Sequence, residues 1–470
     1  DIEWAILSGK VCILQARAIT TLGSGSGTDE DEKLVREYIK DSRISGVMKE
    51  NMSFQLEKMP YAYRPLDYDL MIRINTQKAK IFHEGGIAIT SDPQMDDDGI
   101  MTLPDPHKGI TKNIAHFPGL IKKIMDFRYC AEQCDAFMPR YEERIAELKH
   151  LDFDRMSAKE CGRFLSDAYD MLGELCYDRF KYALFPSALG GRLTKAVQRI
   201  DKKYTNYDLY KGLNNKTSVI TDEVAALSRQ LKENAALSNA ILSGMRYAEL
   251  MERFPECSAY FTDFLEKNGF KSDFNCYCID ARTLYEDPDR LLNILRPLLS
   301  ADTTEEGAGS AKDPAKEYEE MLDKLSALYG RKFPALKEDI EHFRLFHIVR
   351  EESQYLWETL FYYVRKCLAR INLLFLGNTD HAEGISNLFY RELLTACERG
   401  SLTDPDREKI RRRNEKHPLS QKVWDASKLL VFDANGESLK GVSGSSGTAV
   451  GTVCIIHSPA ENNYFIHTDD

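Results

Sequence analysis

Apolar residues recur every three or four positions over most of the chain between residues 118 and 430. This spacing places them on one face of an α-helix, so it predicts a mainly helical region. Ser157 and Glu160 have the spacing of a capping box, which predicts a helix that begins after Ser157. Another helix is predicted to end at Gly330, after apolar positions with helical spacing. These positions are Tyr318, Met321, Leu322, Leu325 and Tyr329.

The segment from Phe343 to Leu376 mixes charged and aromatic side chains with apolar ones. Such a mixture can receive an anionic or aromatic ligand. A long amphipathic helix with its aromatic residues in the core explains it too, and we favour that interpretation for each single residue. The charged and aromatic residues of this segment are Arg344, Arg350, Glu351, Glu352, Tyr355, Trp357, Tyr362, Tyr363 and Arg365.

Two other segments carry local signals. Ala301–Lys312 consists of small, polar and acidic residues, which predicts a surface loop. Asp404-Pro405 resembles the start of a helix.

Residues 69–103 alternate short β-like runs with turns. The expected turns are Gly85-Gly86 and Asp96–Gly99. The acidic run within the second turn lacks the alternating carboxylates and the distant Glu of an EF-hand, so we interpret it as a polar turn. The expected β-like runs are Lys80–His83, Ile87–Thr90 and Ile100–Leu103.

The beginning of the chain predicts a β-hairpin, because two short apolar segments flank a glycine turn. Glu3 lies on the first segment, and Gln15 and Arg17 lie on the second. A carboxylate can hold Mg²⁺, while an amide and a guanidinium two residues apart project from the same face of a strand and can grip phosphate oxygens. On spacing alone, a hairpin with solvated charges remains the alternative.

Composition adds broad limits. The chain has 470 residues, 43% of them hydrophobic and 29% charged, so it can bury substantial cores and is expected to hold two or more domains. Its net charge of −11 argues against general binding to nucleic acid or anionic membranes, although local phosphate pockets fit it. No apolar run approaches the roughly 20 residues of a spanning helix, and no leader is evident. We therefore expect a cytoplasmic protein.

The 11 cysteines are odd in number and mostly lie in apolar surroundings, as expected of reduced, buried thiols. Cys130 with Cys134 and Cys276 with Cys278 are the only close pairs. Neither pair has the further ligands of a zinc site, so we interpret them as core residues.

The hairpin resembles the last two strands of the nucleotide-binding domain in the phosphoenolpyruvate synthase, pyruvate phosphate dikinase and rifampin phosphotransferase superfamily. The family pattern is approximately D-x-E-W-x, a short turn, then L-Q-x-R-P-I-T, and Ala18 stands in place of its proline. The resemblance implies that Glu3 binds Mg²⁺ and that Gln15 and Arg17 contact ATP phosphates. ATP and Mg²⁺ are thus the implied cofactors.

Two further stretches are similar to the central domain of this superfamily. The first motif, residues 264–292, is similar to F-L-x-x-Y-G-H-R, then D at Asp280, then W-x-E-D-P-x-x-L-L from Leu284. The second motif, residues 384–393, is similar to D-I-F-x-L-T-x-x-E-L. The first motif departs from the pattern, because Asn268, Phe270, Lys271 and Leu284 replace Tyr, His, Arg and Trp.

Gly441 to Ile456 resembles the opening of a swivelling phosphohistidine domain. None of the ten histidines has the G-G-x-x-S-H context of the phosphorylated one, which we expect beyond residue 470, and His457 and His467 receive no role. The resemblance divides the chain into four parts. These are 1–22, the end of an ATP-grasp-like domain; 23–39, a flexible charged linker; 40–430, a helical, acceptor-binding domain; and 431–470, the start of the phosphohistidine domain.

Two functional hypotheses follow. In the first, the chain is an excerpt, inactive by itself, of an ATP-dependent dikinase-type phosphotransferase, which passes phosphate from ATP through a phosphohistidine to a small molecule such as pyruvate or a drug hydroxyl. In the second, it is a non-catalytic helical module for ligand binding or scaffolding. Glu3, Gln15 and Arg17 favour the first hypothesis, and the substitutions near Asn268 favour the second. The acceptor and the oligomeric state stay open.

Overall fold

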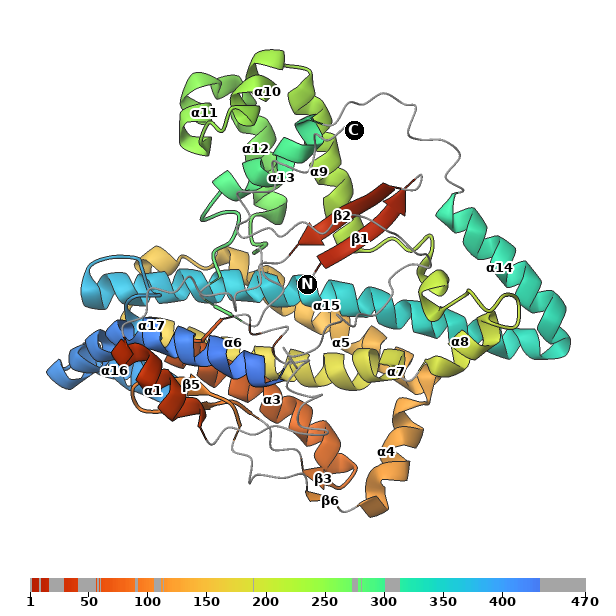
Figure 1. Ribbon diagram of the computed structural model, residues 1–470, viewed down its shortest axis with the longest axis horizontal. Helices are drawn as coiled ribbons and strands as arrows, with labels where there is room; N and C mark the ends of the chain where they lie inside the picture. The colour runs from red at the N-terminus through yellow and green to blue at the C-terminus, as the bar shows by residue number, and fades with distance from the viewer. Residues whose placement is uncertain are drawn as a thin grey trace. The chain divides into compact units, whose positions relative to one another are not determined.

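The computed structural model describes a chain that is mostly helical, which confirms the mainly α fold class (Figure 1). The described residues are 2–7, 10–16, 29–40, 56, 59, 61–88, 92–104, 111–112, 114–188, 190–272, 278–279, 281–300 and 313–431. The chain forms two compact units. Unit 1 comprises Asp1–Ala62, Pro93–His107 and Lys416–Asp470, and unit 2 comprises Tyr63–Asp92 and Lys108–Glu415. The division into four parts that the resemblance implies remains a prediction.

Unit 1 begins with the expected hairpin, in which β1 (Ile2–Leu7) pairs antiparallel with β2 (Lys10–Ala16). Helix α1 (Asp29–Ile39) occupies part of the segment interpreted as a flexible linker, which is therefore helical over these residues. Four acidic residues open this helix, and carboxylates near a helix N-terminus favour helix formation. A second short hairpin joins β4 (Gln94–Met95) to β5 (Met101–Thr102).

The turn between β4 and β5 is the predicted polar turn. Asp96 Oδ1 accepts hydrogen bonds from the backbone N–H groups of Asp98 and Ile100, both at 2.9 Å. Gly99 has a φ of 79°, a conformation that favours glycine. The first carboxylate of the acidic run is thus used to shape the turn.

Unit 2 contains most of the helices, and its two very short strands, β3 (Ile87–Ala88) and β6 (Thr111–Lys112), pair antiparallel. A π-helix (Phe180–Leu184) joins α6 (Ala158–Arg179) to α7 (Phe185–Ala188), and α17 (Asp404–Val431) begins in unit 2 and continues into unit 1. The helices are α3 (Pro65–Glu84), α4 (Phe117–Ile124), α5 (Phe127–Glu147), α6 (Ala158–Arg179), α7 (Phe185–Ala188), α8 (Gly191–Val197), α9 (Lys216–Lys232), α10 (Ala235–Leu242), α11 (Tyr247–Arg253), α12 (Ser258–Asn268), α13 (Asp289–Ser300), α14 (Pro314–Tyr329), α15 (Phe333–Leu376), α16 (Tyr390–Arg399) and α17 (Asp404–Val431).

The prediction of a β-like run at Lys80–His83 is wrong, because these residues form the last turns of α3. The helix forms here because Leu66, Leu70, Ile74 and Ile81 lie on one side of it and are all buried in the core. The Gly85-Gly86 turn that follows the helix is confirmed.

Helix ends follow local sequence signals closely. The capping box at Ser157 and Glu160 is present, and α14 ends before Gly330, whose φ is 50°. The start of α17 is shifted by one residue from the predicted N-cap, since Thr403 Oγ1 accepts the N–H of Asp406 at 3.3 Å. Asp406 in turn accepts the N–H of Thr403 at 2.9 Å, so the reciprocal pair belongs to Thr403.

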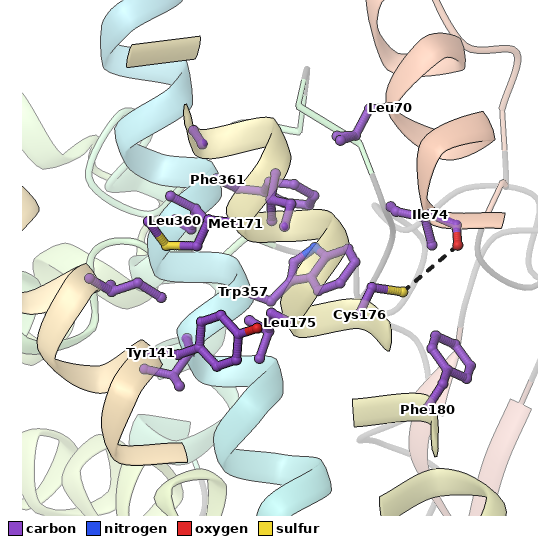
Figure 2. Packing of buried hydrophobic residues seen from close by; sticks show 14 of the residues in the cluster. Leu70, Ile74, Tyr141, Met171, Leu175, Cys176, Phe180, Trp357, Leu360 and Phe361 are labelled. Carbon is purple, nitrogen blue, oxygen red and sulfur yellow. Dashed lines mark hydrogen bonds between the residues drawn. The ribbon is translucent and has the colours of Figure 1, made fainter. Parts of the chain in front are cut away.

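The main hydrophobic core of unit 2 lies where α3, α5, α6 and α15 pack together (Figures 1 and 2). Trp357 of α15 and Tyr141 of α5 are fully buried in it, which supports the core interpretation of Trp357. The Cys176 thiol points to Ile74 O at 3.9 Å. A second, smaller core fills the group of helices α9–α13.

The cysteines behave as expected where they are described. The buried thiols are those of Cys130, Cys134, Cys161, Cys176, Cys257, Cys278, Cys367 and Cys397. Within the described ranges, no group of three or more potential metal-ligating side chains comes together. No helix in those ranges is long and apolar enough to cross a membrane.

Candidate functional site

The two motifs converge in unit 2 on the first turn of α3. The first motif reaches this turn through Ile279, whose N–H is accepted by Asp67, and the second through Tyr390, whose N–H is accepted by Asp69 at 2.7 Å. Several basic side chains gather around the junction. We call Arg64, Arg282, Arg365 and Arg413, together with His381, the arginine cluster.

Arg365, on α15, is the main link between α15 and the first motif. Its Nε and Nη2 atoms donate to both carboxylate oxygens of Glu286, at 2.8 to 3.0 Å, and its Nη1 donates to Ile279 O. The Arg365 side chain is only 7% exposed, whereas that of Glu286 is 34% exposed. This bidentate geometry suits a guanidinium and fixes the position of the E-D-P turn against α15.

Glu286 also organises its own turn. Its Oε2 accepts the backbone N–H and the hydroxyl of Thr283 at 2.9 and 3.0 Å. Burial raises the pKa of Glu286, but hydrogen bonds from Arg365 and Thr283 and the positive charge of Arg365 outweigh it, so the net shift is downward. Glu286 is therefore held in its ionised form.

Asp67 provides the corresponding anchor on α3. It is 2% exposed, and besides the Ile279 N–H it accepts the Cys278 thiol at 3.4 Å. A buried carboxylate is costly unless it is hydrogen-bonded, and these two bonds come from adjacent residues of the first motif. The loop before the E-D-P turn is thereby tied to α3.

His381 lies in the short connection between α15 and the second motif. It is 3% exposed, and its Nδ1 atom is hydrogen-bonded to Ser386 Oγ at 3.0 Å. Burial, followed by the charges of Arg365, Arg64 and Arg282, holds the pKa of His381 well below its usual range. A neutral imidazole packed inside the protein acts here as a positioning residue for the second motif.

The second motif is held by Arg413 and Arg64. Arg413 Nη1 donates to Glu392 Oε2 at 2.6 Å and to Asn387 O at 2.9 Å. Arg64 donates to the side-chain oxygens of Asn387 and Asn414, at 2.9 and 2.8 Å. Burial raises the pKa of Glu392, but its bonds to Arg413, Lys409 and the Phe389 N–H lower it overall. The glutamate of the motif is therefore ionised and paired.

The substituted positions of the first motif have structural partners. Asn268 is 2% exposed and donates to Glu223 at 2.6 Å, while the Lys271 ammonium lies 2.7 Å from the carboxylate of Glu358 on α15. Gly269 is required by close packing, because a Cβ atom there would lie 2.8 Å from the Tyr285 ring. Lys271 thus keeps a positive charge where the family has Arg, and that charge meets a carboxylate.

The residues that are predicted to bind ATP and Mg²⁺ belong to unit 1. Glu3 pairs with Gln15 in the backbone register of the hairpin. Arg17, Asp280 and the glycine-rich stretch at 441–456 lie outside the described residues.

Sequence reasoning missed four residues of the site, namely Arg64, Asp67, Asp69 and Arg413. A helix start with Pro65 at its first position and three charged residues within six positions was the available signal on α3. Arg413 lies within a run of basic residues on α17 that looks solvent-facing in the sequence, and only the fold reveals that it is buried.

The profile of the rifampicin phosphotransferase fourth domain matches residues 183–351, which include the whole first motif. The match confirms, over this part of the chain, the resemblance to the superfamily of phosphoenolpyruvate synthase, pyruvate phosphate dikinase and rifampin phosphotransferase. The match supports an origin of residues 183–351 in a family of phosphotransferases. No curated protein matches the chain.

Proposed function

We propose that this chain is part of an ATP-dependent phosphotransferase of the dikinase type, in which unit 2 serves the acceptor side of the reaction. ATP would phosphorylate a histidine, and the N–P bond of the phosphohistidine would then break as an acceptor oxygen forms a new O–P bond and loses its proton. Splitting the transfer in this way allows two displacements at separate sites. Glu3 would bind Mg²⁺, and Gln15 and Arg17 would contact the ATP phosphates.

The observation that supports this proposal most directly is the junction of the two motifs on α3. Segments about a hundred residues apart meet around four arginines and one neutral histidine, and one segment lies in the region matched by the phosphotransferase family. Guanidinium groups suit phosphate and carboxylate oxygens. In this proposal, the arginine cluster holds the two motifs in place and gives the acceptor-binding region a positive potential.

A second candidate function rests on a specific feature of the same cluster. Arg365, Arg413 and Lys271 are already engaged by Glu286, Glu392 and Glu358 of the chain itself. These internal ion pairs neutralise the positive charges that would otherwise attract a phosphate group. The alternative is therefore a helical binding module that keeps the fold without catalysis.

Phosphorylation of the protein by ATP distinguishes the two functions. The full gene product is incubated with Mg²⁺ and with ATP labelled at the β- or γ-phosphate, and the protein is tested for label that is labile in acid and stable in base. We expect such label, and we expect Glu3→Gln to abolish it because the metal ligand is lost. Glu147→Gln, at an exposed position of α5, is the matched control and should label normally.

Each result has a clear meaning. Stable label on the wild type and on Glu147→Gln, but not on Glu3→Gln, supports the phosphotransferase. A folded protein that takes no label from either position of ATP contradicts it and leaves the binding module. Equal labelling of Glu3→Gln removes the role proposed for Glu3.

A further inference from the structure

A groove of about 520 Å³ lies in unit 2 between α3, α6 and the start of α16. These three helices contact one another, and Figure 1 labels each of them. Its volume is in the range of small-molecule sites. One wall is a stripe along α3 that runs from Asp69 to Lys80, and the opposite wall contains Tyr169, Tyr390 and Arg391. At 1.5 Å of rise per residue, the α3 stripe is about 16 Å long.

The groove is positively charged although the chain as a whole is acidic. Arg73, Lys80 and Arg391 line it against a single carboxylate, Asp69. Arg73 is held in place by Tyr169 O at 3.0 Å and by Asp170, which offsets its charge. Among the described residues, neither Lys80 nor Arg391 has an ion pair within 4 Å or a side-chain hydrogen bond, although the charge of Arg391 acts on the Asp69 carboxylate. The charge of Lys80 is therefore available to a ligand, and that of Arg391 is offset in part by Asp69.

The aromatic wall is rigid. The rings of Tyr169 and Tyr390 are stacked with centroids 4.4 Å apart and an interplanar angle of 15°. Tyr169 is 1% exposed and forms the base of the stack, whereas Tyr390 remains partly exposed. The bond from the Tyr390 N–H to Asp69 fixes the backbone below the ring. A flat ligand ring could extend this stack at low entropic cost.

A glycine of α6 lies close to two polar side chains of the α3 wall. Gly173 of α6 faces Gln77 and Arg73, and a Cβ atom at this position would lie 3.2 Å from Gln77 Nε2 and 3.5 Å from Arg73 Nε. The absence of a side chain lets both groups lie across α6. Gly173 thus leaves room for the Gln77 and Arg73 side chains, which both line the groove.

We propose that this groove is a binding site for a small molecule that carries a phosphate or carboxylate group and a flat aromatic ring. Lys80 and Arg391 would attract the anionic group, and Tyr390 would stack on the ring. The site differs from the arginine cluster, whose Arg365 and Arg413 are occupied by carboxylates of the chain. It does not depend on the phosphotransferase activity proposed above.

Ligand-observed saturation-transfer NMR on the full chain tests the site with phenyl phosphate, benzoate and benzyl alcohol as probes. We expect both anionic probes to bind more tightly than neutral benzyl alcohol. The double variant Lys80→Gln/Arg391→Gln should weaken binding of the better anionic probe by about five- to tenfold, since two exposed cations are removed. The matched control, Lys149→Gln/Arg229→Gln, makes the same charge change at exposed positions outside the groove and should bind within about twofold of the wild type.

The outcomes separate the parts of the proposal. Tighter binding of phenyl phosphate or of benzoate identifies the anionic group, and either supports the site. Equal weakening in both double variants would show a general charge effect and overturn it, as would equal binding of benzyl alcohol. Displacement of phenyl phosphate by inorganic phosphate of similar affinity would overturn the role of the aromatic wall.

Discussion

Arg365 donates to three acceptors from the interior of unit 2, and this gives it a measurable effect on stability. Replacing it by Met would leave Glu286 without its cation and Ile279 O without a donor. We expect Arg365→Met to lower the free energy of unfolding by about 3 kcal/mol, the usual effect of breaking a poorly solvated ion pair. Arg391→Gln removes an arginine charge at an exposed position and should stay within about 0.5 kcal/mol of the wild type.

Urea denaturation followed by circular dichroism measures both variants. Arg365→Lys provides a further comparison, because an ammonium keeps the charge but loses the bidentate geometry. It should fall between the wild type and Arg365→Met. An Arg365→Met protein as stable as the wild type would mean that the pair contributes nothing to the fold.

His381 should make stability depend on pH in a window where few other groups titrate. Its pKa in the folded protein is far below the ordinary value of 6.5, owing to burial and to Arg365, Arg64 and Arg282. Between these two pKa values the unfolded chain binds more protons, so stability is complete above about pH 6.5 and falls as the pH drops below it. The slope approaches about 1.4 kcal/mol per pH unit.

Thermal or urea unfolding at about pH 7.5 and about pH 5.5 tests this titration. Between these conditions the wild type should lose about 1 kcal/mol more than His381→Gln, which cannot take up the proton. His347, whose pKa is also lowered by burial, is present in both proteins and cancels in the comparison. Equal pH dependence of the two proteins would exclude His381 as the source.

Sequence motifs identified some residues of the candidate site but not the long-range partners that they contact. Glu286 and Glu392 were found through their motifs, and Arg365 was one of nine polar or aromatic residues in a segment interpreted as an amphipathic helix. Its partner Glu286 is 79 positions away, so no local pattern relates the two. Pairings at this distance depend on how α15 packs on the first motif, which spacing along one chain does not encode.

At the scale of single elements, local sequence signals predicted where a helix begins or ends better than they predicted whether a segment is a helix or a strand. The capping box of α6 and the end of α14 at Gly330 depend on neighbouring residues only, and both are confirmed. Lys80–His83 was mistaken for a strand, because a short apolar run fits either structure and only the packing of α3 on α6 decides between them. The one-residue shift to Thr403 arose because Thr403 and Asp404 both suit an N-cap.

The close approach of α6 and α16 predicts a sensitive glycine. A Cβ atom at Gly162 would lie 2.8 Å from the Cβ atom of Cys397, and Cys397 is fully buried. We expect Gly162→Ala to lower the free energy of unfolding by about 1–3 kcal/mol, because the helices must separate to admit the methyl group. Gly119→Ala in α4 meets nothing within 4 Å and should be neutral or slightly stabilising. Urea denaturation of both proteins measures the difference in the free energy of unfolding. Equal stability would show that α6 and α16 admit the methyl group without cost.

At the scale of the whole molecule, the sequence predicted one helical domain over 40–430, and unit 2 contains most of it. Two hydrophobic cores divide the helices of this unit. Their separation was not predicted, because amphipathic spacing shows that a helix buries one face but not which partner covers it. The same limit explains why the groove beside α3 was missed, since its walls come from residues far apart in the sequence.

The two cores lead to a prediction about local opening. Phe261 is fully buried at the centre of the second core, where its ring meets Tyr247 edge to face at 5.5 Å. Phe261→Ala removes a large apolar side chain, for which a loss of about 3–5 kcal/mol is usual. Because the residues of this core are contributed by α9–α13, we expect their amides to exchange hydrogen faster while those of α6 and α15 keep their protection.

Hydrogen exchange followed by mass spectrometry measures this directly. Tyr260→Ala is the matched control, since the neighbouring aromatic ring is 45% exposed and its loss should leave exchange in α9–α13 nearly unchanged. Faster exchange of α6 and α15 to the same extent as α9–α13 would show that the two cores unfold together. In that case Arg365–Glu286 and Lys271–Glu358, which link α15 to the first motif, would be the contacts that couple them.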